Sequence, residues 1–199
     1  MTEDRLVPPT FDPADAASAA ARFAATAPAD VHYALVETPV GTLVAAATPR
    51  GLVTLSYADL FGGADGVLDR VAAKLSPRML EAPARLDEVR RELDEYFEGR
   101  RHDFDLPIDW ALASAFGRRV LKATAAIPFG KVSTYGAVAA KAGNPKASRA
   151  AGRALNTNPI PIVVPCHRVV GASGRLVGYA GGLERKVALL EIEGVELPG

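Results

Sequence analysis

Residues 158–170 read Asn158-Pro159-Ile160-Pro161-Ile162-Val163-Val164-Pro165-Cys166-His167-Arg168-Val169-Val170, and they contain the only cysteine of the 199-residue chain. The apolar run 162–164 predicts a short buried strand, and Pro165 ends it, so that Cys166 lies where the chain leaves the core. A lone cysteine in such a place is usually a small buried hydrophobe. Here, however, His167 and Arg168 follow it, and both can favour a thiolate. The sequence therefore predicts a reactive thiol.

Two short helices are predicted immediately before this stretch, at 135–142 and 147–155, separated by the turn 143–145. Two short helices joined by a glycine-containing turn resemble a helix-turn-helix. The second helix carries Arg149 and Arg153 among alanines and a glycine. Small side chains permit a close approach to a partner, although packing against another helix favours them too. Together with the charge pattern described next, the arrangement favours contact with DNA.

Charge is divided unevenly along a chain whose net charge is zero. Residues 1–115 carry 11 basic and 19 acidic side chains, whereas residues 116–199 carry 12 basic and 4 acidic ones. No acidic residue occurs between Asp109 and Glu184, a segment with ten basic residues. An ordinary solvated surface mixes both signs, so this segment predicts a polyanionic partner such as nucleic acid. The basic residues are Arg118, Arg119, Lys122, Lys131, Lys141, Lys146, Arg149, Arg153, Arg168 and Arg175.

The first half of the chain follows a different pattern. Residues 1–30 are rich in Ala, Pro, Asp and Thr, and we expect a tail with a weak helix near 14–25. Beyond it, β-forming segments separated by turns predict a small antiparallel meander, and apolar residues at helical spacing predict two helices. The strands are expected at Val31–Glu37, Leu43–Thr48 and Leu52–Tyr57, the helices at Asp65–Leu75 and Arg85–Phe97, and an edge strand at Phe104–Leu106.

The second half is predicted to be mostly helical. Further helices are expected at Ala113–Ala126 and Glu184–Glu193, on either side of the helix-turn-helix and the cysteine segment. The predicted fold class is α+β, with a small N-terminal α/β domain that contains antiparallel strands and a mostly helical C-terminal domain. We place the tail at 1–30, the first domain at 31–108 and the second at 109–199.

Composition excludes several classes of protein. The chain is 49% hydrophobic and 23% charged, and it has no apolar run long enough for a membrane span. Its first residues are acidic and no apolar signal segment follows, so a cytoplasmic protein without a membrane partner is expected. One cysteine with three histidines offers no disulfide and no structural zinc site. A thiol protease is also excluded, because His167 adjoins Cys166 and no other histidine follows.

The segment Pro165-Cys166-His167-Arg168-Val169-Val170 resembles the acceptor-cysteine signature of the O6-alkylguanine-DNA alkyltransferases, also called methylated-DNA–protein-cysteine methyltransferases. The resemblance extends from about Phe116 to Gly194. The matching segments include Ile127-Pro128-Phe129-Gly130, Thr134-Tyr135-Gly136, Gly143–Ala150, Asn156–Pro159 and Tyr179–Leu183. It implies a DNA repair enzyme that transfers the alkyl group of O6-alkylguanine irreversibly to its own cysteine, once per molecule and without a cofactor. O4-alkylthymine stays open as a second substrate.

The resemblance assigns the chemistry to four residues. Cys166 would be the nucleophile, and His167 would remove the thiol proton through a water molecule. Glu193 would orient that histidine, although from the residues alone it is a surface group near a helix end. Tyr135 matches a tyrosine whose hydroxyl helps to neutralise charge on the departing guanine; otherwise it would be a core aromatic. No metal is implied.

The resemblance also implies how DNA is held. The double-stranded DNA would present its damaged base by rotating the nucleotide out of the stack. Arg149 matches the arginine that enters the stack in its place, beside Ala150 and Arg153 on a helix in the minor groove. The pocket residues would be Asn158, Val169, Tyr179, Ala180 and Lys186, of which Lys186 has no assigned role. No obligatory protein partner is implied.

Two alternatives belong to other classes. A non-enzymatic relative that only binds alkylated bases has another residue, often tryptophan, in place of the cysteine, whereas Cys166 is present here. A sequence-reading regulator would use the helix-turn-helix but would not require the cysteine, the histidine and Glu193 together. The chain departs from many members at Gly117 and Leu121, where glutamine and tryptophan are common; both are packing positions.

Overall fold

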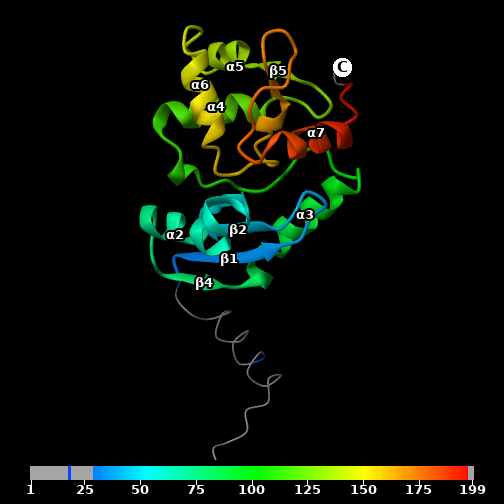
Figure 1. Cartoon of the computed structure of the whole chain (residues 1–199). Coiled ribbons are helices and arrows are strands. Elements are labelled where there is room, and N and C mark those ends of the chain that lie inside the picture. Colours follow the sequence, from blue (N-terminus) through cyan, green and yellow to red (C-terminus); the bar gives the residue numbers. More distant parts are fainter. Residues whose placement is uncertain (1–17, 19–28, 197–199) are drawn as a thin grey trace, which may run out of the picture.

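The computed structural model describes residue 18 and residues 29–196 (Figure 1). The predicted tail and its weak helix near 14–25 therefore lie almost wholly outside the described residues. In the part of the chain that is described, no helix is long and apolar enough to cross a membrane.

The first half is built on a four-stranded sheet with the strand order β3-β2-β1-β4. The strands are β1 (Val31–Val36), β2 (Leu43–Thr48), β3 (Gly51–Tyr57) and β4 (Met79–Glu81). The antiparallel meander β1-β2-β3 is confirmed, with Ala34 opposite Ala45 and Ala45 opposite Leu55. The parallel strand β4 was not predicted, because its three residues, two half-buried and one exposed, carry no readable alternation.

The two faces of this sheet bury different partners. Two helices accompany the sheet, α2 (Ala64–Lys74) and α3 (Asp87–Phe97), close to their predicted ranges. Val71 of α2 packs with Val31, Ala46 and Val53 on one face. Other side chains of β2 and β3 point to the opposite face, with the two-residue period of a strand interrupted in β3 by a register shift opposite Ala46 and Ala47. These belong to a larger core that the second half shares: Leu43, Ala45, Leu52, Leu55 and Tyr57.

The edge strand predicted at Phe104–Leu106 is wrong. The chain pairs with the sheet only afterwards, where Ile108 forms an isolated parallel bridge with Leu52. Leu52 donates its N–H to the Pro107 carbonyl at 2.8 Å. Gly51 permits this approach, since its φ is +129° and a Cβ there would lie 2.2 Å from the Pro107 oxygen. The glycine, rather than the β-forming residues 104–106, decides where the linker meets the sheet.

The second half consists of helices around one short parallel strand pair. The helices are α4 (Ala115–Ala125), α5 (Tyr135–Lys141), α6 (Ser148–Asn156) and α7 (Leu183–Ile192), and the strands are β5 (Ser133–Thr134) and β6 (Val169–Val170). The predicted helices are confirmed to within a few residues at each end. Helices α4, α5 and α6 pack against one another, and the Thr134 hydroxyl accepts the Ala137 N–H at the start of α5.

The strand predicted at 162–164 is also wrong, although its burial was correctly expected. The segment is a buried turn in which Val164 donates its N–H to the Ile160 carbonyl at 2.9 Å, and Ile162 has a φ of +73°. Pro159, Pro161 and Pro165 lack the N–H that a strand ladder needs. Residues Cys166–Arg168 then form a single turn of 3-10 helix.

The two halves are in direct contact. The N–H of Leu55 in β3 donates to the Pro159 carbonyl at 2.8 Å, across 104 positions of the sequence. Figure 1 shows the sheet on one side of this contact and helices α4 to α6 on the other. One hydrophobic core continues through it. The domain boundary at 108/109 stays a prediction.

We predict that Gly51→Ala destabilises the protein by about 3 kcal/mol, because an alanine would be strained at this φ and would overlap the Pro107 carbonyl. Gly99→Ala is the matched control: its φ is +73°, but a Cβ there meets nothing within 4 Å. The control should lose only about 1 kcal/mol, the cost of the left-handed conformation itself. Urea unfolding of the three proteins measures both values; equal losses would contradict the close approach.

Candidate active site

Cys166 begins the 3-10 turn and is 6% exposed. Its sulfur accepts a hydrogen bond from Nδ2 of Asn158 at 3.2 Å, and the same amide donates to the Val164 carbonyl at 2.9 Å. Asn158 follows α6 by two residues, so its side chain joins the end of that helix to the cysteine turn.

The Cys166 thiol is protonated at neutral pH in this environment. Burial raises the pKa of Cys166 to about 11, against the opposing effects of the Asn158 hydrogen bond and the nearby Lys186 charge. Of the two ways in which His167 was expected to help, a larger resting thiolate fraction and proton removal during attack, the environment favours the second. His167 and Arg168 follow Cys166 in sequence, but their side chains make their hydrogen bonds to Glu193.

Both of these side chains contact Glu193, which immediately follows α7. His167 Nε2 lies 2.8 Å from Oε1 of Glu193. Arg168 donates from Nε and Nη2 to the same carboxylate at 2.8 to 3.1 Å. The Tyr96 hydroxyl, from α3 in the first half, donates to Oε1 at 2.8 Å, and the Gly130 N–H donates to Oε2 at 3.3 Å. Glu193 is thus the centre of a buried network that spans both halves.

The electrostatics of this network determine the protonation of His167. Burial alone would raise the pKa of the Glu193 carboxyl, but the hydrogen bonds from His167 and Arg168 outweigh it and lower that pKa to about 2. Burial lowers the pKa of His167 despite its carboxylate partner. A neutral imidazole beside a carboxylate donates from Nε2, which leaves Nδ1 as the acceptor. Among the described residues, Nδ1 has no hydrogen-bond partner.

Sequence reasoning missed two members of this network. Tyr96 lies in the helix predicted at Arg85–Phe97, but no role was assigned to it. Arg168 was counted in the basic run, but it is 3% exposed and also donates to the Ile127 carbonyl at 2.5 Å. It therefore cannot contact a polyanion. The other nine basic side chains of the run are all exposed.

Lys186 is the second buried cation. Its Nζ donates to the carbonyls of Val169 at 2.6 Å and Val177 at 2.9 Å, and burial lowers its pKa to about 8. These bonds join strand β6 to the glycine-rich loop 171–182. The carbonyl of Val169, a residue that the resemblance places in the pocket, thus already accepts one hydrogen bond; its second lone pair is a further acceptor.

A groove of about 630 Å³ reaches Cys166 from the side of α5 and α6. Several predicted site residues line it, from three segments of the chain: Tyr135, Arg149, Arg153, Tyr179 and Ala180. The Tyr135 hydroxyl donates to the Gly178 carbonyl at 3.4 Å, which bridges α5 and the loop. Ala150 lies on α6 but is not among the lining residues. The walls of the groove carry two arginines and two tyrosines.

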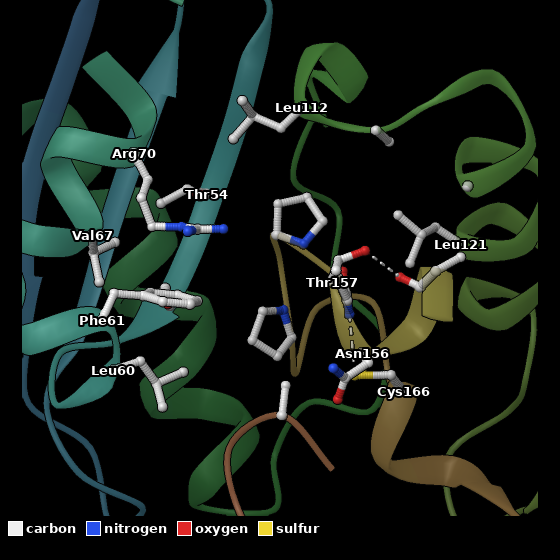
Figure 2. A pocket seen from close by; sticks show the side chains of 18 of the residues that line it. Thr54, Leu60, Phe61, Val67, Arg70, Leu112, Leu121, Asn156, Thr157 and Cys166 are labelled. Atoms are coloured by element: carbon white, nitrogen blue, oxygen red, sulfur yellow. Dashed lines mark hydrogen bonds between the residues drawn. The ribbon is translucent and has the colours of Figure 1, made fainter. Parts of the chain in front are cut away.

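A second cavity, of about 410 Å³, reaches Cys166 from between the two halves. Figure 2 shows Thr54, Phe61 and Arg70 of the first half facing Leu121 and Cys166 of the second half across it. The Arg70 guanidinium lies 4.1 Å from the centre of the Phe61 ring. No sequence signal pointed to this cavity, because neither half contains more than one of its walls.

Comparison with known proteins places the chain in a family. A family model described as "6-O-methylguanine DNA methyltransferase, DNA binding domain" matches residues 115–195, and one described as "6-O-methylguanine DNA methyltransferase, ribonuclease-like domain" matches residues 31–110. The methylated-DNA–protein-cysteine methyltransferase of Methanosarcina acetivorans is 39% identical over 164 residues, which cover 82% of this chain and 99% of the relative. The chain belongs to the methylated-DNA–protein-cysteine methyltransferases.

Solved structures of this methyltransferase family share the fold. The Mycobacterium tuberculosis O6-methylguanine methyltransferase is 38% identical and has a TM-score of 0.70, with 82% of this chain and 92% of that one covered. A structure described as Mycobacterium tuberculosis OGT in complex with DNA is 37% identical and has a TM-score of 0.69, with 81% and 92% covered. The α+β arrangement of a small sheet domain before a helical part is therefore that of the methyltransferases.

No group of three or more His, Cys, Asp or Glu side chains that could hold a metal ion occurs within residue 18 and residues 29–196.

We predict that Glu193→Gln destabilises this methyltransferase by roughly 3 kcal/mol at pH 7, because Arg168 would keep a buried charge without its partner. The folded pKa of Glu193, about 2, lies below the ordinary 4.5. Its stabilisation is therefore complete above about pH 4.5 and is lost as the pH falls toward 2. Urea unfolding at pH 7 and pH 3 should show a smaller difference from wild type at pH 3.

Glu191→Gln is the matched control, since Glu191 is an exposed residue of the same helix end. It should change the free energy of unfolding by less than about 0.5 kcal/mol at either pH. A Glu193→Gln loss that is the same at pH 7 and pH 3 would show that the charge of Glu193 is not what stabilises the fold.

Proposed function

We propose that this protein repairs alkylated DNA by transferring the alkyl group of O6-alkylguanine to Cys166, irreversibly and once per molecule. One observation carries the proposal. The chain's only cysteine lies at the inner end of a groove lined by Tyr135 and Arg149, with a neutral His167 held by Glu193 behind it. A thiol, a base and a groove for a planar ring are the parts that such a displacement needs.

The proposed displacement balances in protons and electrons. The sulfur of Cys166 attacks the alkyl carbon, an S–C bond forms, and the bond between that carbon and O6 breaks. The thiol proton passes to Nδ1 of His167 through a water molecule, and Glu193 stabilises the imidazolium that forms. The departing guanine takes up one proton and becomes ordinary guanine. No cofactor enters, because the cysteine is the acceptor, and the thioether product explains the single turnover.

The burial of the thiol requires the base to leave the duplex. O6 of a stacked guanine cannot reach a sulfur that is 6% exposed at the end of a groove. Arg149 is exposed near the start of α6 and lines that groove. We assign it to the gap in the base stack, where a planar guanidinium can replace the lost stacking. Ala150 and Arg153 on the same helix would face the sugar–phosphate backbone.

The groove offers partners for the extruded guanine. The hydroxyl of Tyr135 can donate to the ring as negative charge develops on it. Tyr179 and Ala180 form the opposite wall, with the Ala180 N–H assigned to O6. Carbonyls of Cys166 and Val169 are assigned to the exocyclic amine. Asn158 and Lys186 act behind this surface, holding the cysteine turn and the loop 171–182.

The charge distribution supports double-stranded DNA as the partner. Nine basic side chains between positions 118 and 175 are exposed, and no acidic residue lies between Asp109 and Glu184. Contacts from such side chains displace counterions from phosphates and bind without regard to sequence. The resemblance of the fold to a relative described in complex with DNA supports the same partner.

The deciding experiment is incubation of the full chain with a duplex that contains one O6-methylguanine, followed by intact-mass and peptide mass measurement. We expect each molecule to gain one methyl group on the peptide that contains Cys166. Cys166→Ser should gain none while binding the same duplex with an affinity near that of wild type, because the sulfur does not contact the phosphates. Methyl transfer by Cys166→Ser, or a methyl group found elsewhere, would contradict the assignment.

We predict that Arg149→Ala slows transfer from duplex DNA by roughly tenfold or more, since unstacking a base costs a few kcal/mol and the arginine offsets part of it. Transfer from the free O6-alkylated base should change little, because a free base has no stack to leave. Second-order rate constants for both substrates measure the difference. The control is Arg90→Ala, which removes an exposed arginine of α3 in the first half. Equal losses on both substrates would assign Arg149 to the shape of the groove instead.

A further inference from the structure

A hydrogen bond from the first half of the chain reaches the wall of the groove. The hydroxyl oxygens of Tyr57 and Tyr179 lie 3.0 Å apart, and their rings meet edge to face with centroids 6.3 Å apart. Tyr57 is the last residue of β3, whereas Tyr179 lies in the loop 171–182 and lines the groove beside Cys166. The residues are 122 positions apart.

Tyr57 has one well-determined position. It is 1% exposed, and the Arg185 guanidinium lies 4.2 Å from the centre of its ring. Arg185 is itself fixed, since it donates to the Val40 carbonyl at 2.9 Å and pairs with Asp59 at 2.7 Å. Gly181 packs directly against Tyr57, since a Cβ at position 181 would lie 2.3 Å from the Tyr57 ring. The hydroxyl of Tyr57 is therefore a fixed point to which Tyr179 can be attached.

Tyr179 has fewer constraints of its own. It lies in a loop whose neighbouring residues, Gly178 and Ala180, are exposed. Burial raises the pKa of both tyrosines, that of Tyr57 to about 12, so both hydroxyls stay protonated and the hydrogen bond persists at neutral pH. Rotation of the Tyr179 ring would change the width of the groove next to the sulfur.

We propose that Tyr57 is a positioning residue for alkyl transfer: it holds the Tyr179 ring so that the base in the groove is aligned with the sulfur of Cys166. The inference rests on the proposed function. Tyr57 does not line the groove to which the base is assigned; it lines the second cavity, between the two halves, and so would not contact the base or the DNA in the groove. Loss of the Tyr57 hydroxyl should therefore lower the rate constant of transfer in the bound complex and leave the affinity for DNA unchanged. Small errors in alignment have large effects on such reactions.

The test is a double-mutant cycle of Tyr57→Phe and Tyr179→Phe in the full chain, which keeps both rings and the contact with Arg185. Single-turnover transfer from an O6-methylguanine duplex gives the rate constant at saturation, and fluorescence anisotropy gives the DNA affinity. We expect Tyr57→Phe to lower the rate constant roughly three- to tenfold, in keeping with the loss of one hydrogen bond. DNA affinity should stay within about twofold.

The decisive arm is the double variant. In a Tyr179→Phe background, Tyr57→Phe should slow transfer no further, because the bond it would break no longer exists. Tyr33→Phe is the matched control, a tyrosine on β1 of the same sheet that does not line the groove, and it should transfer at the wild-type rate. Thermal unfolding checks that each variant is folded.

The outcomes separate this inference from the function on which it rests. A wild-type chain that transfers no methyl group would overturn both. A wild type that transfers normally, together with an unchanged Tyr57→Phe rate or with equal effects of Tyr57→Phe in both backgrounds, would overturn the positioning role alone. Parallel losses of rate and DNA affinity would also overturn it, since they would indicate general loosening of the fold.

Discussion

A carboxylate removed from water costs several kcal/mol unless its charge is neutralised, and Glu193 meets this requirement with four residues from three separate segments. Arg168 and His167 come from the cysteine turn, Gly130 from the loop after α4, and Tyr96 from the first half of the chain. Each partner lies within hydrogen-bonding distance of the carboxylate. The turn that carries Cys166 is therefore fixed by an ionic network that stands behind it and does not touch the sulfur.

This arrangement explains how the protein can keep a reactive thiol in an unreactive form. With a pKa raised to about 11, the Cys166 thiol is protonated at neutral pH and is protected from unrelated electrophiles and oxidants. In the proposed displacement, activation depends on His167, whose neutral imidazole presents Nδ1 as an acceptor because Nε2 is bound to Glu193. The proposed single turnover gives this protection a value, because a thiol consumed in a side reaction would not be regenerated.

Some parts of the structure could be predicted from the sequence, and the exceptions have physical reasons. Helices such as α3 and α6 could be predicted from local hydrophobic periodicity and from glycines. The reactive segment could be recognised by its unusual composition. The strand predicted at 162–164 was wrong because the prolines around it lack the N–H groups that a strand ladder needs. A buried strand and a buried turn can have the same apolar sequence, so apolarity could not distinguish them. Residue 193 was placed at the site by family resemblance alone. Tyr96 and Arg168 could not be assigned, since their roles depend on a contact between segments at least 25 positions apart.

The contact between the halves gives the acidic first half a part in the chemistry of the basic second half. Several of its residues reach across; among them, Leu55 donates to the proline segment, Tyr96 binds Glu193, and Tyr57 binds Tyr179. Helix α5, by contrast, lies at the end of the molecule away from the sheet (Figure 1). The division of charge follows from this geometry. Acidic residues are gathered where they do not oppose a polyanion, and the surface around α5 and α6 is left with exposed cations. The first half can thus hold the cysteine turn in place through the contact between the halves. Its acidic residues do not weaken the attraction of DNA to the surface around α5 and α6.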